Sequence, residues 1–190
     1  MSIFQKIREH LKTKEMKKQL KYSMAEYEKK QAQSLSLSLE EFTALSDDDL
    51  IFVALARTEK KVDEFDDLKN GFDSLNQSQK VFYSLNWLES EVNNGGLCQF
   101  FVNSSRMVAP LVSGYMEIVG AAEHKKLYDE FVEKNKIDLT DLSYFDIDEV
   151  DEFEEKTQAY PFDEYDDAFC NMEPIETYLK KYIREHITDF

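Results

Sequence analysis

The sequence predicts an all-α protein, with one compact domain of several helices and a basic helical arm at its N-terminus. Apolar residues recur at spacings of three and four over much of the chain, as on the buried face of a helix. Glycine occurs 5 times and proline 3 times in 190 residues, so few positions break a helix. Strand patterns are weak, and the length fits a single domain with an appendage.

The arm differs in charge from the rest of the chain. Residues 1–30 contain nine lysine and arginine side chains against four acidic ones, a balance of +5. A partial apolar helical face runs through Met16, Leu20, Met24 and Tyr27. We interpret residues 1–40 as an arm that packs on the acidic body or on a second subunit; a membrane-surface or partner-binding helix is the alternative.

Residues 34–39 alternate serine and leucine, which predicts an extended connector between the arm and an acidic helical domain over residues 41–190. The first helix of that domain is expected to begin at Ser46 or Asp47. Its first turn is rich in aspartate, which suits the positive end of a helix dipole, and it continues through residues 50–57.

A longer helix is expected to begin at Asn76 or Ser78, with apolar residues from Val81 to Val92 at helical spacing. Gly95 and Gly96 should end it, because a helix C-terminus favours residues that tolerate positive φ. A short helix carrying Phe100 and Phe101 should follow. Further helices are expected at residues 111–121, 123–135 and 148–157, and from Pro174, as the first helical residue, to residue 187.

The net charge limits the kind of partner. The whole chain carries −16, and residues 31–190 hold 14 basic and 35 acidic side chains, a balance of −21. Such an excess repels nucleic acid and anionic membranes and favours basic partners. No apolar run approaches the ~20 residues of a membrane helix. With no secretory signal, and with Cys98 and Cys170 lying apart as reduced thiols, we expect a cytoplasmic protein.

Catalytic chemistry is poorly represented. His10, His124 and His186 belong to no nucleophile motif, and acid pairs are too common to single out a catalytic dyad. A calcium-binding loop is suggested by Asp146, Asp148 and Asp151, but Asp151 occupies the position where an EF-hand loop needs glycine. We expect no enzyme activity, no catalytic residues, no cofactor and no dedicated metal site; a metal-dependent enzyme is the weakest alternative.

One window is unusually acidic. Residues 138–167 hold thirteen acids against Lys156, a balance of −12. Aromatic residues are threaded through it and should bury, which would hold the carboxylates in fixed places. The acids expected to form a partner-binding surface are Asp146, Asp148, Glu149, Asp151, Glu152, Glu154, Glu155, Asp163, Glu164, Asp166 and Asp167.

Helical spacing indicates a function for this acidic segment. Carboxylates one helical turn apart lie about 5–6 Å from each other. Duplex DNA offers one phosphate per about 3.4 Å of axis on each strand. A folded acidic face can therefore imitate a row of phosphates and bind a DNA-binding protein. The alternative reading is a solvated surface that serves solubility.

Residues 87–105 carry a specific pattern: a tryptophan, then Glu-x-x-Asn-Gly-Gly, a glutamine, two aromatics and Asn-Ser. Its residues here are Trp87, Glu91, Asn94, Gly95, Gly96, Gln99, Phe100, Phe101, Asn103 and Ser104. This pattern resembles the signature of a bacterial DNA-mimic protein family, catalogued as a domain of unknown function. The resemblance extends over roughly residues 45–190, and Arg106 departs from it, since relatives often carry glycine nearby.

The resemblance implies a helical protein that dimerises and inhibits a transcription regulator by occupying its DNA-binding surface. We interpret the signature itself as structural: Gly95 and Gly96 form a sharp turn, Glu91 and Asn94 bond the freed backbone groups, and the two phenylalanines fill the core. An immunity or antitoxin protein that neutralises a basic toxin fits the same charges. Neither reading requires direct contact with nucleic acid or a membrane.

Overall fold

The structure is a computed structural model that describes residues 14–147 and 150–190, and within them it is all-α, as predicted. The helices are α2 (Lys14–Ser36), α3 (Leu39–Thr43), α4 (Asp47–Val62), α5 (Leu68–Ser74), α6 (Gln77–Val102), α7 (Ala109–Val119), α8 (Ala122–Asn135), α9 (Val150–Ala159), α10 (Phe162–Cys170) and α11 (Ile175–Glu185). Short 3₁₀ turns are η1 (Ser104–Val108), η2 (Ser143–Phe145) and η3 (Ile187–Asp189).

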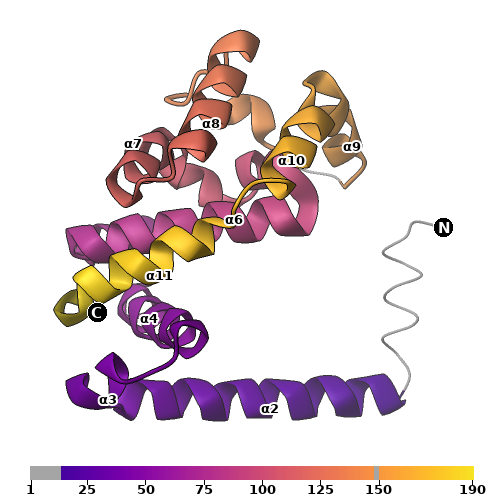
Figure 1. The fold of residues 1–190 in the computed structure, drawn as a ribbon. Coiled ribbons are helices and arrows are strands. Elements are labelled where there is room, and N and C mark those ends of the chain that lie inside the picture. Colours follow the sequence, from indigo (N-terminus) through magenta and orange to yellow (C-terminus); the bar gives the residue numbers. More distant parts are fainter. Residues whose placement is uncertain (1–13, 148–149) are drawn as a thin grey trace.

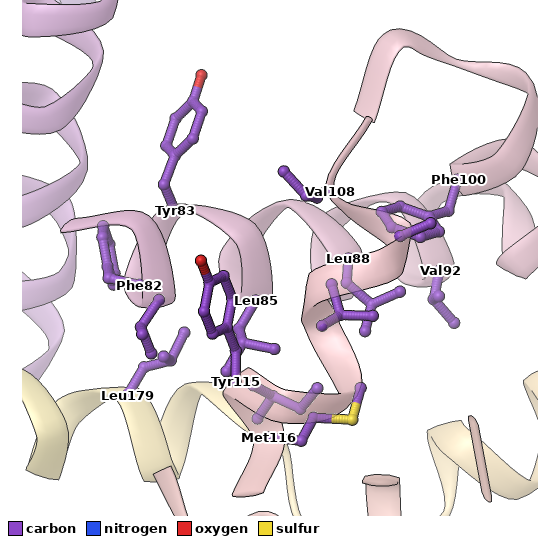
Figure 2. Packing of buried hydrophobic residues seen from close by; sticks show 14 of the residues in the cluster. Phe82, Tyr83, Leu85, Leu88, Val92, Phe100, Val108, Tyr115, Met116 and Leu179 are labelled. Atoms are coloured by element: carbon purple, nitrogen blue, oxygen red, sulfur yellow. The ribbon is translucent and has the colours of Figure 1, made fainter. Parts of the chain in front are cut away.

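Helix α6 lies at the centre, with α7, α8 and α10 on one side and α11 and α4 on the other (Figure 1). Its apolar residues pack against Val108 of η1, Met116 of α7 and Leu179 of α11, as Figure 2 shows. Leu85, Leu88 and the two phenylalanines of the signature have no exposed surface. Each such side chain stabilises the fold by roughly 1.5–3 kcal/mol, so α6 organises the core.

The predicted beginnings of α4 and α6 are confirmed. Ser46 caps α4 by accepting a hydrogen bond from the backbone N–H of Asp49 at 3.3 Å. Asn76 and Gln79 form a reciprocal capping box at the start of α6. Both caps satisfy backbone donors that the first turn of a helix leaves free.

The beginning of α11 is capped from another helix. Pro174 occupies the cap position, one residue before the first helical residue, and provides no capping side chain. Glu89 of α6 is buried beside this helix start. Burial raises the pKa of Glu89 to about 7, although backbone N–H groups of Glu176 and Ile175 favour its charged form. The helix ends at Glu185, two residues before the predicted end at residue 187.

The extended connector predicted at residues 34–39 is wrong. Helix α2 continues to Ser36, and only Leu37 and Ser38 lie outside a helix before α3 begins. The hydroxyls of Ser34 and Ser36 donate to the backbone oxygens of Lys30 and Gln33, at 2.9 and 2.7 Å. Serine is thus accommodated in the last turn of the helix, where alternation with leucine imitates a strand pattern.

Among the described residues, the C-terminal half of α2 packs on the body. The rings of Tyr27 and Phe52 meet edge to face at 5.7 Å, and the Lys30 ammonium lies 4.3 Å from the Phe52 ring centroid. Lys30 also lies 3.7 Å from Asp49. These contacts agree with an arm that packs on the acidic body. No helix in the described part of the chain is both long and apolar enough to cross a membrane.

Candidate functional site

The two glycines of the signature break α6 into two helical parts. Gly96 has φ of +81° and ψ of 174°, and Gly95, with φ of −159° and ψ of 21°, is also non-helical. A Cβ atom on Gly96 would lie 2.1 Å from Oδ2 of Asp166, so a side chain is excluded there by backbone strain and by crowding. The predicted interruption of the helix at these glycines is confirmed.

The carboxylate of Glu91 accepts hydrogen bonds from polar side chains on the other side of the kink. Its Oε2 atom accepts hydrogen bonds from the side-chain amides of Gln99 at 2.5 Å and Asn103 at 2.9 Å. Its Oε1 atom accepts from the hydroxyl of Ser105 at 3.1 Å. The prediction that Glu91 bonds freed backbone groups is wrong, because its carboxylate crosses the kink to side chains. Asn94 is exposed.

The two phenylalanines of the signature fill the core, as the sequence predicted. Phe100 and Phe101 are completely buried. Trp87 is half-buried against the core, with its ring centroid 4.7 Å from that of Tyr83. The glycines of the signature therefore bend α6, and its aromatic residues pack in the core behind the bend.

Asp166 links the acidic segment to the kink. Its Oδ1 atom accepts a hydrogen bond from the backbone N–H of Leu97 at 2.8 Å, which satisfies a donor that the bend has freed. Burial raises the pKa of Asp166, the Leu97 N–H lowers it, and the nearby carboxylates of Asp163 and Asp167 raise it. Asp166 is half-buried and turned inward, so its position supports a role in the fold.

A chain of aromatic rings anchors the acidic segment. Phe145 stacks on Phe101 of the signature at a centroid distance of 5.0 Å, and Phe162 lies 5.3 Å from Phe131 of α8. Tyr165 lies 5.2 Å from Phe131 in turn. The aromatic residues of the acidic segment were predicted to be buried, and this is confirmed for Phe145, Phe162 and Tyr165. It is wrong for Tyr144, which is 49% exposed. Phe153 of α9 is partly buried against the same core, so the acids of α9 and α10 lie on helices that are fixed to it.

The structure assigns different surroundings to the predicted acids. Asp146 forms an ion pair with Arg106. Glu152 is half-buried. Asp148 and Glu149 lie outside the described residues, and so does the side chain of Asp151. The acids exposed on α9 and α10 are Glu154, Glu155, Asp163, Glu164 and Asp167.

These five exposed acids make the surfaces of α9 and α10 strongly anionic, and we call them together the anionic face. Asp163 and Asp167 are four residues apart on α10, which places their Cβ atoms about 5–6 Å from each other. Lys156 is the only basic residue in the sequences of α9 and α10. Its ammonium lies 4.1 Å from the Tyr144 ring centroid.

Sequence reasoning overlooked a second exposed group of acids. Asp63, Glu64 and Asp66 lie between α4 and α5 and are exposed, while Asp67 caps α5 by accepting from the backbone N–H of Asn70 at 2.9 Å. Their close spacing in the sequence was the available signal. This group provides a natural comparison for tests of the acids on α9 and α10.

Among the described residues, the histidines and cysteines do not gather into a cluster. His124 is buried between the rings of Phe169 and Tyr178, and its two ring nitrogens have no hydrogen-bond partner among the described residues. Burial raises the pKa of the Cys98 thiol to about 12. Within residues 14–147 and 150–190, no group of three or more histidine, cysteine or acidic side chains could hold a metal ion. His10 lies outside the described residues.

The fold and the site define a small acidic helical protein whose exposed carboxylates are carried by helices fixed to an aromatic core. The family model for DMP19-like proteins matches residues 73–186, and the chain belongs to this family. No curated protein and no solved structure gives a significant match. The matched segment contains the whole signature and the acidic segment but begins later than the expected residue 45, so α2, α3 and α4 lie outside it.

Proposed function

We propose that the chain is a DNA mimic, which binds the DNA-binding surface of a basic regulator or another nucleic-acid-binding protein and inhibits it. The observation that carries the proposal is the ordered anionic face of α9 and α10 within a chain of the DMP19-like family, a family of DNA mimics. The inhibition would be non-enzymatic, and the cytoplasm is where such a partner would be met.

The anchoring of the face supports this proposal over a merely solvated surface. A disordered acidic tail would lose conformational entropy on binding, whereas α9 and α10 already hold their acids in place, through Phe153 of α9 and through Phe162 and Tyr165 of α10. Complementary charge accelerates association and selects basic partners. The interaction should weaken as salt rises, because screening acts over about 8 Å at physiological ionic strength.

The test begins with capture of proteins by the tagged chain from the cells that encode it, at low and at high salt, followed by mass spectrometry. The proposal expects basic nucleic-acid-binding proteins that elute as salt rises, and expects the chain to displace the captured protein from DNA. Capture of a basic toxin would instead favour the immunity or antitoxin function. Acidic or neutral partners that resist molar salt would contradict both.

Two charge-matched variants locate the binding surface. One replaces Glu155, Asp163 and Asp167 by lysine; these exposed acids lie on α9 and α10. The comparison variant makes the same replacement at Asp63, Glu64 and Asp66, outside the family segment. Loss of capture only in the first variant, with helical content retained by both, is the expected result. Equal losses would show that total charge, and not this face, attracts the partner.

A further inference from the structure

A pocket of about 170 Å³ lies where the C-terminal half of α8 meets the beginning of α10. These two helices pack against each other on one side of α6 (Figure 1). The walls of the pocket are mostly apolar and include Leu127, Phe131, Pro161 and Tyr165. Small-molecule sites normally have volumes of about 300–1,000 Å³, whereas a cavity of about 150 Å³ holds one benzene molecule. The pocket therefore has the size that a single side chain fills.

Hydrogen-bond acceptors surround this pocket. Glu130 of α8 and Glu164 of α10 each supply a carboxylate. The side-chain nitrogen of Asn135 donates to the backbone oxygen of Phe131 at 2.8 Å, so its Oδ1 atom remains available to accept. Lys134 is the only cation among the residues that line the pocket, and it is exposed, so its ammonium can stay in solvent. The pocket thus offers acceptors around an apolar interior.

The two carboxylates differ in their present partners. Glu130 has the ammonium of Lys126 at 3.7 Å, but both side chains are more than half exposed, so this ion pair is weak. Glu164 is exposed and has no ion-pair partner among the described residues. The helix dipoles do not decide the sign of the potential, because the negative end of α8 and the positive end of α10 oppose each other here. The carboxylates, above all that of Glu164, therefore make the pocket attractive to a cation.

We propose that the pocket takes the side chain of an arginine from the protein that binds the anionic face. Its apolar walls cover the aliphatic stem of the arginine, while the charged end meets the carboxylates. A guanidinium has five N–H donors and no acceptor, which matches a rim of acceptors. Its weakly hydrated plane can lie against aromatic rings, which Phe131 and Tyr165 provide at a centroid distance of 5.2 Å from each other. A lysine ammonium is more strongly hydrated and has no such plane, so the pocket prefers arginine.

The source of the arginine rests on the proposed function. DNA-binding proteins use arginine to contact base edges and to enter narrow minor grooves, so their DNA-binding surfaces carry exposed arginines. Glu164 belongs both to the anionic face and to the pocket, which places such an arginine at the edge of that face. The exposed carboxylates supply long-range attraction, and the pocket adds one defined contact of the kind in which arginine often dominates binding.

Titration of the ¹⁵N-labelled full-length chain with the blocked tripeptide acetyl-Gly-Arg-Gly-amide tests the pocket without the partner. Nuclear magnetic resonance should show saturable shifts of the Asn135 side-chain amide and of backbone amides in residues 127–135 and 164–165. A lysine peptide has the same charge, and a citrulline peptide has nearly the same shape without the charge; both should bind at least about fivefold more weakly. Equal binding of the arginine and lysine peptides, or unsaturable shifts at all exposed acids, would overturn the proposal.

Single substitutions around the pocket locate the contact. Glu164→Gln should weaken binding of the arginine peptide at least about fivefold, because a charged acceptor is lost. Glu155→Gln is the matched control: it removes the same charge from α9, outside the pocket, and should change binding less than about twofold. Lys134→Gln should strengthen binding, because it removes a competing cation. All three positions are exposed, so the variants should retain their helical content. Unchanged binding by Glu164→Gln, or weaker binding by Lys134→Gln, would contradict the proposal.

The pocket and the DNA mimicry can fail independently. The lysine variant of Glu155, Asp163 and Asp167 leaves Glu164 in place, and the peptide titration needs no partner. Saturable arginine binding by a chain that captures no nucleic-acid-binding protein would contradict the mimicry and support the pocket as an arginine site. With a captured partner, Glu164→Gln should release it at lower salt than Glu155→Gln does. Release of both variants at the same salt concentration would show that no arginine enters the pocket in the complex, and would leave the mimicry standing.

Discussion

The Oδ1 atom of Asp166 lies 2.8 Å from the backbone nitrogen of Leu97, so a residue of the acidic segment closes the kink in α6. The two residues are 69 positions apart in the sequence, and no local pattern pairs them. Through this bond the bend of the signature and the position of α10 depend on each other. Disturbing the kink should therefore also disturb the anionic face.

Gly96→Ala should lower the free energy of unfolding by about 2–4 kcal/mol, because it adds strain at positive φ and displaces the Asp166 carboxylate. Urea unfolding followed by circular dichroism measures the change.

Two other glycines separate these causes. Gly120 has φ of +83° but open space around its Cβ position, so Gly120→Ala should cost only the strain, about 1–2 kcal/mol. Gly114 lies within α7, also with open space, and Gly114→Ala should raise stability by about 0.4–1 kcal/mol. Equal effects of Gly96→Ala and Gly120→Ala would show that crowding against Asp166 is unimportant.

Glu91→Ala should lower the free energy of unfolding by about 2–4 kcal/mol, since Gln99, Asn103 and the buried Ser105 all lose a charged acceptor. Asn94→Ala is the comparison within the signature and should change stability by less than about 0.5 kcal/mol, because Asn94 is exposed. If Asn94→Ala abolishes partner capture without loss of stability, the signature takes part in recognition and our structural interpretation of it is too narrow.

Glu89→Gln should stabilise the protein at pH 8 by about 1–3 kcal/mol and have little effect at pH 4. Burial raises the pKa of Glu89 from 4.5 to about 7, so the folded state retains a proton that the unfolded state loses. Stability due to this group is present below pH 4.5 and is lost as pH rises through 7. Unfolding free energies at pH 4–8 measure the difference, with the exposed Glu155→Gln as control. A pH-independent difference would contradict the assignment.

His124→Phe should stabilise the protein, by about 1–3 kcal/mol, and more at pH 5 than at pH 7. The buried imidazole has two nitrogens without partners, and burial lowers the pKa of His124 below 6.5. Below pH 6.5 the unfolded state gains a proton that the folded state resists, so the wild-type loses stability on acidification. Thermal unfolding at both pH values measures this; His186→Gln, at a half-exposed ring, is the control. Greater stabilisation at pH 7 would show that the ring is charged when folded.

Short-range hydrogen bonds explain which helices could be predicted from the sequence. Ser46 and Asn76 each bond backbone donors within three residues, so the beginnings of α4 and α6 could be read directly. Residues 34–39 misled the prediction because serine hydroxyls bond backbone oxygens three and four residues earlier inside α2. Helices α5 and α10 were overlooked, since each is short and surrounded by acids that resemble a loop.

The sequence by itself determined the helical class, the charge difference between arm and body, and the bend at Gly95 and Gly96, because spacing, charge and glycine act over a few residues. Only the tertiary structure decided the partners of Glu91 and Asp166 and the exposure of each acid. Those contacts depend on how α6, η2 and α10 pack through Phe101, Phe145 and Phe162. A carboxylate turned to solvent and one turned to a backbone N–H have the same letter in the sequence. Packing between distant segments distinguishes them, since it alone determines which carboxylate is buried away from solvent.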